Sequence, residues 1–76
     1  RDGFGTYFYP NGDVFQGHFV CGRRHGQGVY KYSEGGIYDG EWSHDKMHGK
    51  GRFTYASGNV YEGLWFEDVP HGVGKF

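Results

Sequence analysis

Three histidines at equal spacing are the residues best placed for metal chemistry in this chain. His25, His48 and His71 are separated by 23 residues each, and imidazole is a common zinc ligand. Zinc, however, needs its ligands about 2 Å from one ion. Equivalent positions of successive β-hairpins lie two strands apart, roughly 9–10 Å. We therefore predict that these histidines cap loops, that His18 and His44 are surface residues, and that the chain holds no metal or other cofactor.

Repeated Gly-x-Gly pairs are the second candidate for chemistry, because glycine-rich loops bind phosphate. The pairs, such as residues 3–5, begin predicted strands, and no helix follows to supply N-terminal N–H groups. No Ser/His/Asp or Cys/His set stands at matched positions. The acids of the strands and turns fit solvated positions: Asp13, Asp39, Glu41 and Glu62. We predict that the chain is not an enzyme and has no catalytic residues.

Length and charge exclude several other classes. The 76 residues form at most one small domain. A formal net charge of −1 argues against nucleic acid, which requires a clustered positive surface. Cys21 is the only cysteine, so no internal disulfide forms, and we interpret it as a loop residue rather than a reactive thiol. There is no apolar run of about 18 residues and no leader. Both ends look cut, so we expect a piece of a longer protein.

A period of 23 residues organises the whole chain. The stretch from Arg24 to Lys46 matches the residues 23 positions before and after it, with glycines and aromatic residues in register. The chain contains 16 glycines, seven tyrosines, seven phenylalanines and two tryptophans. Such self-similarity is typical of stacked repeats. We predict one repeat array with units at residues 1–23, 24–46 and 47–69 and a partial unit at 70–76.

Alternation within each unit predicts two strands around a turn. Residues 3–9 and 14–19 alternate with period two, and residues 10–13 have turn chemistry. The same pattern predicts hairpins at 26–42 and 49–65, crossovers at 20–25, 43–48 and 66–71, and a final strand at 72–76. We expect Tyr9 to face Phe15, which places rings over opposed glycines. The predicted fold is all-β, an elongated single-layer antiparallel array of hairpins.

The aromatic residues gather on the glycine-bearing face. Parity places only Phe4, Phe8 and Phe66 on the other face, together with Asp39, Glu41 and Glu62. The rings of the glycine-bearing face include Phe15 and Phe19. Either they only pack against one another, or they line a groove, because Tyr and Trp are common interface anchors. The predicted partner-binding residues are Tyr7, Tyr9, Tyr30, Tyr32, Tyr38, Trp42, Phe53, Tyr55, Tyr61 and Trp65.

The pattern Gly-x-Gly-x-Tyr-x-Tyr-x-x-Gly-x-x-Tyr-x-Gly-x-Trp, read from Gly26 to Trp42, resembles the MORN (membrane occupation and recognition nexus) repeat. The resemblance covers three units and the start of a fourth. The first unit departs from it, with Phe15 for Tyr, Phe19 for Trp and Asp2 for His, so a hydroxyl or indole hydrogen bond is missing there. The resemblance implies a twisted single-layer array with an aromatic-lined groove. Members are scaffolds that hold helical partner segments, sit in ciliary or cytoskeletal assemblies, or precede enzyme domains.

We therefore expect a non-catalytic scaffold that binds a partner peptide or helix through this groove. The alternative is weak peripheral binding to anionic phospholipid or phosphoinositide through Arg23, Arg24 and Lys46, or a regulatory role in a larger enzyme. Opposite charges along the crossover edge favour a protein partner. Open edge strands favour end-to-end self-association. The expected location is cytoplasmic, with the cilium, the cytoskeleton or the membrane periphery implied by the resemblance.

Overall fold

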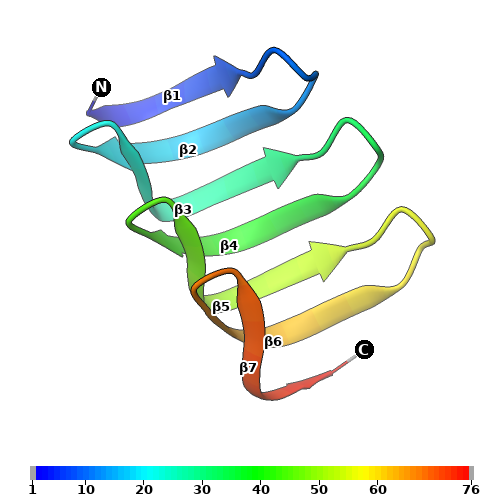
Figure 1. Ribbon diagram of the computed structural model, residues 1–76. Coiled ribbons are helices and arrows are strands. Elements are labelled where there is room, and N and C mark those ends of the chain that lie inside the picture. Colours follow the sequence, from blue (N-terminus) through cyan, green and yellow to red (C-terminus); the bar gives the residue numbers. More distant parts are fainter. Residues whose placement is uncertain (1, 76) are drawn as a thin grey trace.

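Alternating side chains produce seven β-strands in one open antiparallel sheet, in the order of the sequence (Figure 1). The computed structural model describes residues 2–75, with side chains described for residues 2–71. All elements in that range are strands: β1 (Gly3–Phe8), β2 (Val14–Val20), β3 (Arg23–Lys31), β4 (Ile37–Ser43), β5 (Lys46–Thr54), β6 (Val60–Phe66) and β7 (Val69–Lys75). The prediction of an all-β, single-layer array of hairpins is confirmed.

Longer loops join β1 to β2, β3 to β4 and β5 to β6, all at the same end of the strands (Figure 1). In the first, the Tyr9 N–H donates to the Asp13 carbonyl at 2.9 Å, and the Gly12 N–H donates to the Tyr9 carbonyl at 3.0 Å. Gly12 has φ of 99°, a conformation that glycine adopts without strain. The same two bonds recur at Tyr32 and Tyr55. The three predicted turns are therefore present.

The register predicted for the first hairpin is wrong by two residues. Tyr7, not Tyr9, pairs with Phe15, and Gly5 pairs with Gly17. The reason is the loop, because Tyr9 is already bonded to Asp13 and belongs to the turn. A shift of two residues keeps each side chain on its face, so the assignment of faces holds.

The predicted crossovers are also wrong, because these segments are not loops. Strand pairing continues through them up to two-residue turns at the opposite end of the strands. The turns are Cys21-Gly22, His44-Asp45 and Glu67-Asp68, and all six residues have positive φ. Positive φ at both central residues is the tight hairpin geometry that matches strand twist. On the strand after each turn, two extra residues form a bulge, and Figure 1 shows these strands bending there. The bends are centred near Gly26 and Gly49, both with φ of 84°.

A row of glycines crosses the sheet perpendicular to the strands. It contains one glycine from each strand: Gly5, Gly17, Gly28, Gly40, Gly51, Gly63 and Gly74. The Phe15 ring covers Gly28, and the Tyr38 ring covers Gly51, so a Cβ at either glycine would overlap a ring. Rings therefore cover glycines as expected, but the covered glycine lies diagonally on the next strand rather than directly opposite.

The core is a single layer of rings on that face. Buried side chains are Phe15, Phe19, Tyr30, Tyr38, Trp42, Met47, Tyr61 and Trp65. Trp42 packs edge-to-face between Phe15 (centroids 5.3 Å apart) and Tyr38 (5.2 Å), and Tyr38 meets Trp65 in the same way at 5.4 Å. Such contacts stabilise aromatic pairs beyond the area they bury. On the opposite face Phe8 is 73% exposed, and Phe4 and Phe66 are exposed too, which confirms the predicted asymmetry.

Candidate functional site

The predicted partner-binding rings fall into two groups. Half of them are buried in the ring layer: Tyr30, Tyr38, Trp42, Tyr61 and Trp65. The other half remain accessible: Tyr7, which is 43% exposed, and the half-buried Tyr9, Tyr32, Phe53 and Tyr55. A partner can touch the second group without unfolding the sheet. The residues that can bind are therefore fewer than parity alone predicts.

Three of these accessible rings form a line that we call the tyrosine row: Tyr9, Tyr32 and Tyr55. Each directly follows β1, β3 or β5 and is held by its backbone bonds to the loop. Each ring also packs on the ring two residues earlier, with centroids 4.6 Å apart for Tyr7 and Tyr9 and 4.5 Å for Tyr30 and Tyr32. Burial raises the pKa of Tyr9 and Tyr32, so their hydroxyls stay neutral donors. Successive members lie two strands apart, roughly 9–10 Å.

A hollow of about 260 Å³ adjoins the tyrosine row on the ring face. It is lined by Tyr7, Tyr9, Phe19, Gly22 and Asp45. Rings and one carboxylate thus meet in a concave surface, as at many binding sites.

Arg24 lies within the ring face, which the sequence did not predict. Its guanidinium carbon is 4.7 Å from the Trp42 ring centroid, 5.2 Å from Tyr30 and 6.0 Å from Tyr9. Only 19% of its side chain is exposed, and Nε bonds to Asp45 at 2.7 Å. Of the three residues proposed for lipid contact, only Arg23 and Lys46 are exposed. The equivalent of Arg24 one period later is Met47, which joins the buried core.

The tight turn between β4 and β5 is bonded to the start of β3, and the tight turn between β6 and β7 is bonded to the start of β5. We call these two contacts the joints of the array. In the first joint, Asp45 Oδ1 accepts the Arg24 N–H at 3.0 Å, and the Asp45 N–H donates to the Arg24 carbonyl at 2.9 Å. In the second, Asp68 accepts the Met47 N–H at 2.8 Å and donates back at 3.0 Å. The bonds of Arg24 hold the pKa of Asp45 below its usual range, although burial opposes this. The signal for the joints was an aspartate recurring after 23 residues.

The prediction that Asp13 is solvated is wrong, because it is only 7% exposed. Its carboxylate accepts the Ser33 N–H at 2.7 Å, the Tyr30 hydroxyl at 2.7 Å and the Asn11 amide at 3.2 Å. The Ser33 backbone bond, followed by the Tyr30 hydroxyl, lowers the pKa of Asp13. Burial, followed by the hydrogen bond from its hydroxyl to Asp13, raises the pKa of Tyr30. Asp13 therefore joins the first loop to the second hairpin.

The histidines lie close to other rings. The centroids of His25 and His44 are 5.5 Å apart, and Phe66 lies 5.3 Å from His48 and 5.6 Å from His71. Within residues 2–71, no three His, Cys, Asp or Glu side chains meet in a way that could hold a metal ion.

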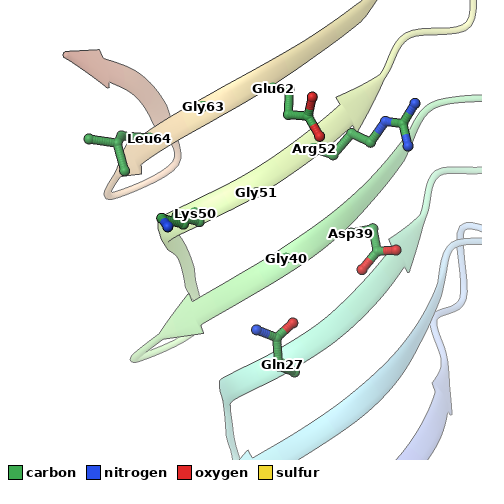
Figure 2. A pocket seen from close by; sticks show the side chains of 9 residues that line it. All are labelled: Gln27, Asp39, Gly40, Lys50, Gly51, Arg52, Glu62, Gly63 and Leu64. Atoms are coloured by element: carbon green, nitrogen blue, oxygen red, sulfur yellow. The ribbon is translucent and has the colours of Figure 1, made fainter. Parts of the chain in front are cut away.

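The opposite face carries a shallow trough of about 630 Å³ over the glycine row (Figure 2). Its residues are Gln27, Asp39, Gly40, Lys50, Gly51, Arg52, Glu62, Gly63 and Leu64. Figure 2 shows Lys50 and Arg52 on either side of Gly51, with Asp39 and Glu62 on the neighbouring strands. Two acids and two bases balance one another, so the trough does not favour a ligand of either charge.

A membrane-crossing helix is not found in the part of the chain that the structure describes.

Comparison with protein families matches the MORN repeat to residues 1–14, 15–37, 38–60 and 61–76. The two complete matches repeat with the 23-residue period of the sequence but begin at Phe15 and Tyr38, the rings that cover the glycine row. A search of curated proteins finds no match.

Proposed function

The chain belongs to the MORN repeat family, and from that premise we propose that it is a non-catalytic scaffold that binds a segment of a partner protein on its ring face. The observation that carries the proposal is the tyrosine row. Tyr9, Tyr32 and Tyr55 are half-buried beside a closed aromatic core. Each of the three side chains is already held by packing against the ring two residues earlier, so little conformational entropy is lost when a partner covers it.

The spacing of the row supports an elongated partner rather than a small molecule. Members that lie roughly 9–10 Å apart can be reached together by one extended or helical segment. Tyrosine offers both a broad apolar ring and a hydroxyl, and it is enriched at binding hot spots. The hollow beside Tyr7 and Tyr9 adds a place for one projecting side chain.

The test uses peptides selected from a random display library on the immobilised protein. Affinities are then measured for wild type, Tyr32→Ala and Phe8→Ala, after circular dichroism shows that each variant is folded. We expect Tyr32→Ala to weaken binding by about 2 kcal/mol, roughly 30-fold. Phe8→Ala removes an exposed ring from the opposite face and should leave affinity unchanged.

Mapping on the wild-type protein avoids any doubt about variant folding. Bound peptide should shift the NMR signals of Tyr9, Tyr32 and Tyr55 more than those of Phe8 and Ile37 on the opposite face. Peptides that instead shift the opposite face, or bind Tyr32→Ala as tightly as wild type, would refute this function.

A further inference from the structure

Two histidines meet in the first joint. His25 belongs to β3, and His44 is the first residue of the tight turn between β4 and β5. Their rings are perpendicular, with centroids 5.5 Å apart. The His44 backbone N–H points to Nδ1 of His25 at 3.4 Å, and His44 Nδ1 lies 3.0 Å from the Ser43 hydroxyl. A ring nitrogen accepts such a bond only while it carries no proton.

The equivalent position of the preceding unit shows what this contact does. Asp2 stands 23 residues before His25, and its Oδ1 accepts the N–H of Cys21, the equivalent of His44, at 2.6 Å. The side chain at this position thus accepts a hydrogen bond from the backbone N–H of the next tight turn. A carboxylate keeps that ability in mild acid, whereas an imidazole loses it between pH 5 and 8.

The charges around the pair add to the effect. Arg23 and Arg24 precede His25 on β3, and Asp45 and Lys46 follow His44. Asp45 is committed to Arg24 through the 2.7 Å ion pair. Protons on His25 and His44 therefore add two positive charges beside Arg23 and Lys46.

We propose that the first joint is a proton-sensitive contact that loosens when His25 and His44 are protonated. Loss of the acceptor and repulsion between the two imidazolium groups act in the same direction. The second joint differs, because His48 and Glu67 take the places of His25 and His44. A proton on His48 creates opposite charges there, so acid does not weaken that joint.

Amide hydrogen exchange followed by NMR tests this within one molecule. Between pH 7.5 and 5.5, the protection factors of the Arg24 and Asp45 amides should fall about fivefold, the loss of one ordinary hydrogen bond. Those of the Met47 and Asp68 amides, which make the same bonds in the second joint, should not fall. Equal changes at both joints, or protection at the first joint that is constant within twofold, would overturn the proposal.

Two variants use residues that the chain already places at these positions. His44→Glu copies Glu67, which has nearly the same φ (46° against 49°), and should abolish or reverse the acid response. His25→Asp copies Asp2 and should also prevent the fall. His18→Gln changes a histidine of β2 outside the joint and should keep the wild-type response. A response that survives His44→Glu and His25→Asp, or disappears in His18→Gln, would contradict the assignment to this pair.

Discussion

Phe15 and Tyr38 explain why the middle of β3 and of β5 is glycine. Each ring is fully buried and lies against the backbone of a glycine on the next strand, where a methyl group would overlap it. Trp42 and Trp65 complete the arrangement, because their indole N–H groups donate to the carbonyls of Gly28 and Gly51 at 3.2 and 3.3 Å. The glycines are thus required by close packing rather than by flexibility.

Gly28→Ala should therefore destabilise the protein by about 1–3 kcal/mol, the usual cost of overpacking a rigid core. The added methyl group would overlap the Phe15 ring, which cannot move into solvent. Chemical denaturation gives the free energy of unfolding. Gln27→Ala, an exposed neighbour on the same strand, is the matched control and should change it by less than about 0.5 kcal/mol. Equal effects of the two substitutions would contradict this account.

Asp13 should make stability depend on pH in the acid range. Because its folded pKa is lowered, the ionised carboxylate stabilises the fold above its ordinary pKa, near 4. That contribution is lost as pH falls through the lower folded value. Asp13→Asn should therefore lose stability at pH 7, and its deficit relative to wild type should shrink below pH 4. Unfolding curves from pH 7 to pH 2 measure this, and a deficit constant with pH would refute it.

At the scale of elements, the bulges connect the strands to the joints. The two extra residues near Gly26 bend β3, so that its start, still paired with β2, leaves the ladder with β4 and bonds to the next tight turn. Arg24 is carried by this bend onto the Trp42 ring. The same geometry at β5 brings Met47 into the core. The bend thus converts a flat meander into an array with contacts between neighbouring hairpins beyond strand pairing.

Replacing the joint aspartates by glycine tests this role without backbone strain, because Gly22 occupies the equivalent position of the first turn with similar φ. Asp68→Gly should cost about 1 kcal/mol, since it removes one acceptor from the Met47 N–H. Asp45→Gly should cost more, about 2 kcal/mol, because it also removes the carboxylate that pairs with the mostly buried Arg24 guanidinium. Denaturation midpoints decide the order. An Asp45→Gly variant as stable as Asp68→Gly would contradict it.

Strand positions and faces were predictable because alternation and the 23-residue period report them directly. The tight turns were missed because His44, Asp45, Glu67 and Asp68 adopt positive φ without the glycine that usually signals it. The register was missed because nothing in the sequence assigns Tyr9 to the loop rather than to the strand. For the site, the alternation of side chains predicts the face on which a ring lies but not how deeply the ring is buried. Tyr30 and Tyr32 share a face, yet only Tyr30 is buried.

The whole molecule is a thin plate, 33 × 24 × 15 Å. In the described sheet each strand pairs only with its sequence neighbours (Figure 1). Stability in such an array is approximately a sum of unit and nearest-neighbour terms. The joints and the loop residue Asp13 extend these terms by one hairpin, since Asp13, Asp45 and Asp68 each bond a residue about 20 positions away. The period of 23 residues is therefore a requirement of three kinds of contact: pairing, ring packing and the joints.

An extra copy of residues 24–46 inserted after Lys46 should be accepted, because it supplies two strands, a ring set and a joint in phase with its neighbours. At the usual stability per residue it should raise the free energy of unfolding by about 1–3 kcal/mol, with a larger denaturant dependence from the added buried surface. The same insert lacking the copy of Val29 turns the preceding part of its strand to the other face. That variant should be less stable than the protein without any insert. If both inserts have the same effect, phase is not what holds the array together.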